Sequence, residues 1–505
     1  MTLKLHNTLT KKIEDFTPIS DESVTLYTCG PTVYDFLHVG NWAAYVYWDT
    51  LVRTLQTNDF KINRVMNITD VGHLVSDEDE GEDKLQKGAR LEGKTAWEVA
   101  EFYGQDFLKG MKRLNMIEPE HIAKATDFID EQLELVRTLK NKGYSYQIDD
   151  GIYFDTSKFP TYADFAGLDL DAQKAGARVT FNAEKRNPSD FALWKFSPVG
   201  EKRDMEWETP VDLLDKQQVA VGGAVPTSTR VITEEGGADQ PTGPVMGFPG
   251  WHLECSAMAM SILGNTIDIH TGGIDHIPVH HTNEIAQSES ASGQKFANFW
   301  IHNNHIKANG TKISKSLGNG YTLDDLEEKG FSPLDYRMFI LQGHYSNEGN
   351  FTFENLEAAK QRLKNWRSVA ALRHQTHDTV GDHSDNDDPS LAVVGAVREA
   401  LSDNLNTPEV LRIIDEVFTH LESHSRERID QDALEGLLEA IDDMLGLQLL
   451  NSTPDISDEI KQKILERQQV REAKNWDSSD RIRDELLKDG IVLNDTKDGT
   501  LWQYA

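Results

Sequence analysis

A β-α-β unit is predicted near the amino terminus by the alternation of apolar and polar positions. Ser23 to Gly30 (SVTLYTCG) is rich in β-branched and aromatic residues and ends at a Gly-Pro turn. Asn41 to Gln56 carries apolar side chains at spacings of three and four, as a helix packed on a sheet does, and Lys61 to Gly72 returns to a strand pattern. This order predicts a parallel sheet, which binds ligands beyond the carboxyl ends of its strands, where Cys29 and Gly30 lie.

The pattern changes twice beyond this unit. From Thr126 to Pro244 a helical stretch precedes short strands, and the sheet pattern resumes at Thr266 to Asp275, which predicts an α+β insertion between two halves of the parallel sheet. Beyond Asn350 the periodicity is helical, and the end of the chain predicts a helix and a hairpin. The expected fold class is α/β: a split parallel sheet, then a helical bundle, then a small carboxyl-terminal α+β unit.

Three local patterns predict where elements begin and end. The charged, glycine-containing stretch Ser76 to Thr95 predicts a solvated surface loop. Thr407 is expected to cap a helix that has Pro408 at its first position. A single helix from Arg471 to Lys488 is expected to close at Gly490.

Composition excludes two broad classes. No run among the 505 residues approaches the roughly eighteen uninterrupted apolar residues of a membrane helix. Two cysteines are too few for a disulfide scaffold. The first residues lack the apolar core and the small-residue cleavage site of a secretory signal, so a cytoplasmic protein is expected.

The charge of the chain argues against binding a polyanion over a broad surface. Lysine and arginine total 51 against 84 aspartate and glutamate residues, so the formal net charge is −33, the wrong sign for bulk electrostatic attraction. A polyanion would have to meet a local basic patch. The clearest one is a predicted helix that carries Lys360, Arg362, Lys364, Arg367 and Arg373, although a solvated helix face would look the same.

A first candidate nucleotide-binding segment lies between the first strand and the first helix. Neither GxxxxGK[ST] nor GxGxxG occurs, so the two commonest phosphate loops are absent from the sequence. His38 and Asn41 are placed at a helix amino terminus, whose N–H groups attract phosphate, and Gly40 allows an adenine or ribose to approach the backbone. Because the segment HVGN (residues 38–41) is only four residues long, it is weak evidence for a nucleotide site on its own.

A second candidate segment is KISKS, which holds Lys312, Ser314, Lys315 and Ser316. Two lysines three apart in such a loop suit a mobile clamp on the charge that develops at a transferred phosphoryl group. An ordinary pair of surface lysines is the alternative. The combination of the two segments, one in the first half of the sheet and one after the second half, favours a nucleotide site.

A metal site is one interpretation of the only two thiols. Cys29 and Cys255 each lie at an end of a predicted element, and His280 and Glu284 are four apart, so on a helix they share one face. Cysteine, histidine and carboxylate ligands suit Zn²⁺. Because the thiols are far apart in sequence, two buried structural cysteines remain the alternative.

The sequence segments around these residues resemble those of a known family. YTCGPTVYDFLHVGN, GFPGWHLECSAM, DIHTGGIDHIPVHHTNEIAQSE and KISKSLGN are similar to the signatures of class I aminoacyl-tRNA synthetases, and most closely to the cysteinyl-tRNA synthetase family. The resemblance spans nearly the whole chain. Departures from the family pattern are Val39, Asn41, Val279, Ile313 and the long Gly/Thr-rich stretch before Gly247.

The resemblance implies a reaction and a set of site residues. Cysteine and ATP would give cysteinyl-adenylate, and the cysteine would then pass to the 3′-terminal ribose of tRNA(Cys). The implied ligands of one Zn²⁺ per chain are Cys29, Cys255, His280 and Glu284. The implied catalytic residues are His38, Asn41, Lys312 and Lys315, which bind ATP and its Mg²⁺ together with Gly40, Ser314 and Ser316. The implied cysteine pocket is Gly30, Thr32, Thr69, Trp251, His270 and Asp275.

A metal would give such an enzyme its selectivity. Cysteine and serine differ by one atom, and a hydrophobic pocket separates near-isosteres by only about a hundredfold. Zn²⁺ binds a thiolate strongly and a serine hydroxyl poorly, so a contact between the substrate sulfur and zinc would select cysteine.

The resemblance also implies a domain plan and a monomer that contacts no membrane. The expected units are a Rossmann-like catalytic domain in two halves (1–125 and 245–305), an inserted connective peptide (126–244), a stem-contact region with the KISKS loop (306–350), a tRNA-contacting helical bundle (351–450) and an anticodon-binding unit (451–505). Candidate anticodon contacts are Trp476, Arg481, Arg483 and Trp502.

Two other functions fit part of the sequence. A cysteine ligase that passes cysteine to an amino sugar uses the same activation chemistry, but such enzymes lack the anticodon-reading end that this chain retains. An inactive tRNA-binding or zinc-storage protein has no need of intact HVGN and KISKS segments.

Overall fold

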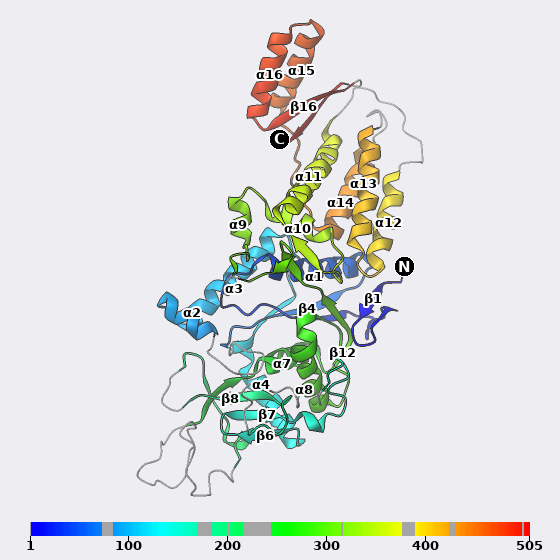
Figure 1. The fold of residues 1–505 in the computed structure, drawn as a ribbon. Helices are drawn as coiled ribbons and strands as arrows, with labels where there is room; N and C mark the ends of the chain where they lie inside the picture. The colour runs from blue at the N-terminus through cyan, green and yellow to red at the C-terminus, as the bar shows by residue number, and fades with distance from the viewer. Residues whose placement is uncertain are drawn as a thin grey trace.

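The computed structural model of the chain describes residues 2–72, 84–169, 184–198, 203–215, 244–314, 317–375, 389–423, 431–496 and 499–504. The molecule is elongated, with an inserted sheet at one end, a parallel sheet in the middle, a helical bundle beyond it and a small carboxyl-terminal unit at the other end (Figure 1). Within the described ranges, no helix combines the length and the apolarity that crossing a bilayer requires.

A five-stranded parallel sheet forms the centre. Its order is β12-β11-β3-β4-β5, and every pairing in it is parallel. The chain builds β3, β4 and β5 in one direction and later adds β11 and β12 on the other side of β3, so the strand order reverses between β3 and β11. Ligands of such sheets bind at that reversal. The strands are β3 Val24–Thr28, β4 Ile62–Ile68, β5 His121–Lys124, β11 Ile267–Gly273 and β12 Ala297–Asn303.

Helices cover both faces of this sheet, because its strands are apolar on both sides. Leu26 and Met66 pack into a cluster with helix α1 (Val39–Thr57), whereas the adjacent Tyr27 and Val65 pack into a cluster on the opposite face. That second cluster includes helix α7 (Trp251–Leu263), which contacts α8 (Thr282–Ser292), and helix α3 (Ala96–Arg113) packs on α1. The predicted β-α-β unit is β3, α1 and β4.

A second, antiparallel sheet is inserted between β5 and β11, as the sequence predicts. Its order is β6-β7-β8-β10-β9, and helix α4 (Ile129–Asn141) packs against α7 and α8. Its strands are β6 Ser145–Ile148, β7 Gly151–Phe154, β8 Phe191–Phe196, β9 Trp207–Glu208 and β10 Met246–Pro249. The Gly/Thr-rich stretch falls almost entirely outside the described residues.

The carboxyl-terminal third is helical and ends in a hairpin. The bundle contains α10 Pro333–Leu341, α11 Phe353–Ala370, α12 Pro389–Ser402, α13 Thr407–Ser423 and α14 Gln431–Leu445. The last unit contains α15 Asp458–Glu472, α16 Trp476–Lys488, β16 Ile491–Thr496 and β17 Gly499–Tyr504. The remaining elements are β1 Lys4–Asn7, β2 Lys12–Asp15, α2 Lys84–Glu92, β13 Ile306–Ala308, β14 Thr311–Lys312, α9 Leu323–Glu328 and β15 Gly349–Phe351. The expected α/β fold class is confirmed.

Three local predictions were wrong. The expected surface loop of residues 76–95 is wrong where the structure describes it, since residues 84–92 form helix α2, with Leu85 and Ala89, four apart, buried against α3; residues 76–83 lie outside the described residues. Helix α13 is capped by Asn406, whose Oδ1 accepts from the Glu409 N–H at 3.3 Å, and not by Thr407. The expected single helix from 471 to 488 is divided between α15 and α16, since Lys474 takes a left-handed backbone conformation with φ of 60°.

A buried ion cluster joins α1 to the bundle. The Asp49 carboxylate accepts from Arg53 Nε at 2.7 Å, from the Arg337 guanidinium and from the Ile117 N–H at 2.7 Å. Arg53 donates to the carbonyls of Asp442 and Asp443, and Arg337 donates to that of Leu445. Two guanidinium groups therefore cap the last turn of α14, where a helix carries partial negative charge.

Asp49→Asn should destabilise the protein by about 3–5 kcal/mol, since it leaves two buried guanidinium groups without their carboxylate. Burial would raise the Asp49 pKa, but Arg337 and Arg53 outweigh it and lower that pKa. A carboxyl with a lowered folded pKa stabilises fully above its unfolded pKa of about 3.9, and the stabilisation is lost as the pH falls. Urea unfolding should therefore show that the free energy of unfolding differs less between the variant and the wild type at pH 3 than at pH 7.

The control for this variant is Asp443→Asn, which makes the same charge change on an exposed side chain of the same helix end. Its effect should stay within about 0.5 kcal/mol. Equal losses in the two variants would show that net charge, and not the buried cluster, accounts for the effect.

Candidate functional site

A cavity of about 910 Å³ opens at the carboxyl edge of the parallel sheet, where the strand order reverses. Its wall is built from the segments that follow β3, β4, β11 and β12, together with the start of α1. The predicted site residues that line it are Cys29, Gly30, Thr32, His38, Gly40, Asn41, Thr69, Trp251, Cys255, Asp275, His280, Lys312 and Ser314. Lys315 and Ser316 lie outside the described residues.

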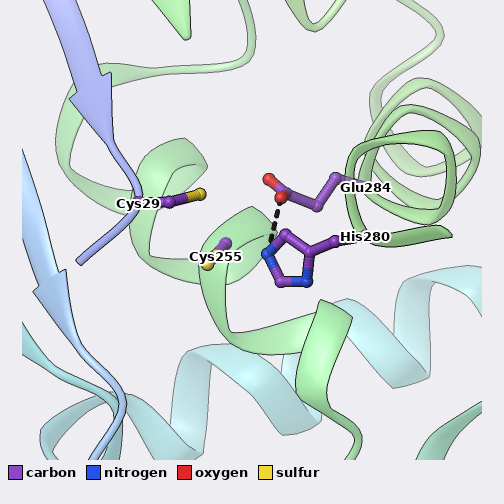
Figure 2. A group of neighbouring side chains, drawn as sticks. All are labelled: Cys29, Cys255, His280 and Glu284. Carbon is purple, nitrogen blue, oxygen red and sulfur yellow. Dashed lines mark ion pairs between the residues drawn. The ribbon is translucent and has the colours of Figure 1, made fainter. Parts of the chain in front are cut away.

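Four side chains from distant parts of the chain converge on one side of this cavity (Figure 2). Cys29 follows β3, Cys255 lies on α7, His280 lies in the π-helical turn Ile277–His281, and Glu284 lies in the first turn of α8. All four are buried, and one potential ligand atom of each lies within 4.8 Å of the others. The reversal of strand order brings the first thiol beside residues that follow β11.

The arrangement fits a tetrahedral zinc ion. Two sulfurs, an imidazole nitrogen and a carboxylate oxygen are donors that Zn²⁺ takes. Glu284 Oε1 lies 2.9 Å from His280 Nε2, yet makes no well-formed hydrogen bond with any described residue. Glu284 Oε1 and His280 Nε2 are therefore placed so that both can coordinate the same metal ion. A second group, Cys29, His270, His281 and Glu284, is equally compact and shares two members with the first.

The charges within the cluster prepare Cys255 and Glu284 to bind a metal ion, whereas Cys29 and His280 must each release a proton to act as ligands. A hydrogen bond from Cys29 lowers the pKa of the Cys255 thiol to about 6, whereas burial raises the Cys29 pKa well above its usual value. Burial would lower the pKa of His280, but the charges of Glu284 and Cys255 raise it to about 10. Burial would raise the pKa of Glu284, but His270 and His280 lower it to about 2. A thiolate and a carboxylate are thus ready as ligands.

Three of the four candidate ligands have a buried histidine behind them. These contacts are His281 Nε2 to Cys29 Sγ at 3.4 Å, His252 Nδ1 to His280 Nδ1 at 3.0 Å, and His270 Nε2 to Glu284 Oε2 at 2.8 Å. The contact between the Nδ1 atoms leaves Nε2 of His280 to face a metal, since a ligating histidine bonds an outer partner through its other nitrogen. His270, expected in the cysteine pocket, instead lies behind Glu284 and is not part of the cavity wall.

The start of helix α1 forms another part of the wall. His38 Nδ1 accepts from the N–H groups of Gly40 at 3.1 Å and Asn41 at 3.3 Å, and the Asn41 side chain accepts from the His38 N–H. These N–H groups, expected to attract phosphate, are thus already bonded to His38. Because Nδ1 accepts, the proton of the neutral His38 ring lies on Nε2. A Cβ on Gly40 would come within 3.0 Å of Ile313 Cδ1, so the helix start and the KISKS segment touch.

The described part of the KISKS loop is held by an asparagine. Asn319 Oδ1 accepts from the Ser314 N–H at 2.8 Å, and its Nδ2 donates to the carbonyl of Lys312 at 3.1 Å. Lys312 is exposed at the end of β14 and lines the cavity. The asparagine therefore fixes the backbone beside the lysine.

The remaining pocket residues bring two strand ends together. Gly30 lies so close to β4 that a Cβ would come within 1.6 Å of the Asn67 carbonyl oxygen, which only glycine avoids. Thr32 and Thr69 form a parallel bridge, and Trp251 lies with its ring centroid 4.6 Å from that of His280. The cavity thus places the candidate metal ligands next to the candidate nucleotide segments.

Several residues of the site were missed in the sequence. Asn67, His252, His281, His302 and Asn319 all hold a cavity residue or a candidate ligand, directly or through one neighbour. One signal could have pointed to the histidines, since seven of the 17 lie between residues 252 and 305. The two asparagines act through backbone contacts, which leave no such pattern.

Comparison with known proteins decides the family. A family profile described as "tRNA synthetases class I (C) catalytic domain" matches residues 15–213 and 232–361. A second, described as "Cysteinyl-tRNA ligase anticodon binding domain", matches residues 453–502. The chain is 38% identical to "Cysteine--tRNA ligase" of Treponema denticola, over 100% of both chains. It is also 38% identical to "Cysteine--tRNA ligase 1" of Burkholderia lata, over 99% of this chain and 96% of that protein.

The chain belongs to the cysteinyl-tRNA synthetase family.

Solved structures support the class I synthetase fold. A Mycobacterium tuberculosis methionyl-tRNA synthetase in complex with methionyl-adenylate superposes with a TM-score of 0.56 at 13% identity, over 84% of this chain and 92% of that one. The Agrobacterium radiobacter K84 LeuRS complex with tRNA also gives 0.56, at 11% identity, over 88% and 86% of the two chains. The family profiles and the full-length relatives confirm the resemblance to the cysteinyl-tRNA synthetase family, and these structures confirm the fold that it implied.

Proposed function

We propose that the chain activates cysteine with ATP to cysteinyl-adenylate and transfers the cysteine to the 3′-terminal ribose of tRNA(Cys). Family membership implies tRNA, ATP and an amino acid as substrates. One observation carries the choice of cysteine: three of the clustered candidate ligands, Cys29, Cys255 and His280, line the same cavity as the start of α1 and the described part of the KISKS segment, and Glu284 lies beside His280. A cavity with both features can hold a thiol-bearing amino acid beside a nucleotide.

Cysteine is selected, in this proposal, through a Zn²⁺ held by Cys29, Cys255, His280 and Glu284. The bound ion would supply a bond that the sulfur of cysteine makes strongly and the hydroxyl of serine makes weakly. The protein side chains hold this site in place. Trp251 packs on His280 and lines the cavity, where it limits the space for a larger side chain.

ATP is proposed to lie across the start of α1, with Mg²⁺ on its phosphates. The carboxylate of cysteine is already an anionic nucleophile, so no general base is needed and catalysis consists of placement and charge stabilisation. His38 donates from Nε2 toward phosphate, and Gly40 lets the nucleotide approach. The Lys312 and Lys315 ammonium groups neutralise the charge on the phosphoryl group during attack.

The carboxyl-terminal unit is proposed to read the anticodon. Trp476 is 57% exposed, and the Arg481 and Arg483 side chains are also exposed, so all three can meet unstacked bases. Trp502 is 5% exposed and packs against Tyr504 in the core of the unit, so it supports the hairpin instead.

The basic helix α11 and the 3₁₀ turn that follows it (Ala371–His374), which carries Arg373, contribute less to tRNA binding than their charge indicates. Arg362 pairs with Asp415 at 2.6 Å, and Lys360 donates to the carbonyl of Gly330. Arg367 and Arg373 bond to the segment that follows α14, through Ser452 and Thr453 respectively. Lys364 is exposed, whereas the other four cations are half-buried, and it is the one proposed to meet the tRNA backbone.

The test combines three measurements on the full chain. Cysteine-dependent exchange of pyrophosphate into ATP should be observed, with about one zinc per chain, and tRNA(Cys) should be charged. Exchange without charging of tRNA would favour a ligase that uses another acceptor. No exchange would rule out the proposed activity.

Trp476→Ala should weaken tRNA use and leave cysteine activation unchanged. Base stacking on an aromatic ring contributes about 1–3 kcal/mol, so the KM for tRNA(Cys) should rise by about 5- to 150-fold. Trp476→Phe keeps a ring and should recover most of the loss, while pyrophosphate exchange stays at the wild-type rate in both variants. An unchanged KM in Trp476→Ala would exclude a stacking role.

A further inference from the structure

A chain of hydrogen-bonding groups runs from the metal cluster to the amino-terminal hairpin. Cys29 Sγ lies 3.4 Å from His281 Nε2, His281 Nδ1 lies 2.7 Å from His302 Nε2, and His302 Nδ1 lies 2.8 Å from Thr8 Oγ1. Thr8 lies in the turn between β1 and β2, and its N–H donates to the carbonyl of Trp300 on β12. The contacts thus connect one candidate ligand to a residue near the start of the chain.

This series of hydrogen-bonded side chains is buried along almost its whole length. His281 is wholly buried and His302 is 6% exposed, whereas Thr8 is half-buried. The His302 ring lies parallel to Trp300, at 5°, which fixes its plane. His281 Nε2 is also 3.9 Å from Glu284 Oε1, but the Cys29 sulfur is the nearer acceptor.

The sulfur determines the direction of these bonds. A metal-bound cysteine is a thiolate, which accepts hydrogen bonds and has no proton to donate. His281 must then present Nε2–H to Cys29 and accept at Nδ1 from His302 Nε2–H. His302 in turn accepts at Nδ1 from the Thr8 hydroxyl. Each ring is neutral with one donor and one acceptor, and Thr8 supplies the terminal donor.

We propose that Thr8 and His302 are positioning residues that act through His281 to hold an N–H donor against the Cys29 sulfur. The inference rests on the metal site proposed for this cluster. A hydrogen bond to a thiolate draws electron density away from the sulfur and fixes its place, so these residues set how strongly Cys29 binds the ion. Outer partners of metal ligands typically contribute 10- to 100-fold in affinity.

The experiment uses the full chain with Co²⁺ as a spectroscopic probe and Zn²⁺ in chelator competition. His302→Phe keeps a flat ring beside Trp300 but removes both nitrogens. It should lower zinc affinity about 10- to 100-fold and shift the thiolate-to-cobalt charge-transfer band to longer wavelength, because a sulfur that loses a donor gives up electrons more readily. Thr8→Val should shift both readouts in the same direction by less.

Thr8→Ser is the matched control, since it keeps the hydroxyl and should match the wild type in band position and affinity. A merely structural role for the hairpin would lower the melting temperature without moving the band. An unmoved band and an unchanged affinity in both His302→Phe and Thr8→Val would overturn the inference alone. Failure of the wild type to bind either ion would overturn the proposed metal site as well.

Discussion

Cys255→Ala should remove the bound metal and most of the preference for cysteine over serine. The Cys255 sulfur is one of four candidate ligands, and alanine leaves three of them with a single thiol. Without a metal contact, the pocket must separate two near-isosteres by shape, which gives about a hundredfold. The ratio of kcat/KM values for cysteine and serine in pyrophosphate exchange should therefore fall by about 10²- to 10³-fold, to roughly that limit.

A control is needed because Cys255 is buried. Met258→Leu lies on the same helix, is as deeply buried and changes little volume, so it should retain metal and selectivity. Zinc content and kinetics are measured on both variants alongside their thermal melts. A metal-free Cys255→Ala protein that still prefers cysteine by the wild-type factor would refute selection by zinc.

Lys312→Met should lower the rate of adenylate formation by about 10²- to 10³-fold, the usual effect of removing one group that stabilises transition-state charge. The KM for cysteine should change less than about twofold, because the lysine acts on the phosphoryl group and not on the amino acid. Lys312 is exposed at the end of β14, so its removal leaves the core intact. Pre-steady-state measurement of adenylate formation separates the two quantities.

The matched control for Lys312 is Lys109→Met, which removes one exposed charge from α3 outside the cavity. It should leave both the rate and the KM unchanged. Proportional losses of rate and cysteine affinity in Lys312→Met would place the lysine in amino-acid binding instead.

Much of the fold could be predicted because its strands are apolar and glycine and proline residues mark turns between them. The order of β3, α1 and β4 follows from their periodicity, and the insertion follows from the change of pattern after Thr126. Helix α2 was missed because its apolar residues, among them Leu85 and Ala89, are few and stand between charged residues. The cap at Asn406 was missed because Asn and Thr are both good caps and stand next to each other.

The candidate ligands could be selected from the sequence, but the residues that support them could not. Sulfur, imidazole and carboxylate side chains are rare enough at this spacing to be noticed. The partners behind them, such as His252 and His302, touch other protein side chains, so their roles depend on three-dimensional placement. The same holds for the arginines of α11, because no sequence pattern shows that Arg362 meets Asp415.

The reversal of strand order has a consequence for when the proposed metal site is completed during synthesis. Cys29 leaves the ribosome long before Glu284, and at 5–20 residues per second the interval is roughly 10 to 50 s. For most of that interval one edge of β3 has no neighbouring strand, since β11 (Ile267–Gly273) is made only shortly before Glu284. A nascent chain stalled before residue 280 therefore lacks two of the four candidate ligands, His280 and Glu284, and the proposed metal site can be filled only after Glu284 has been made.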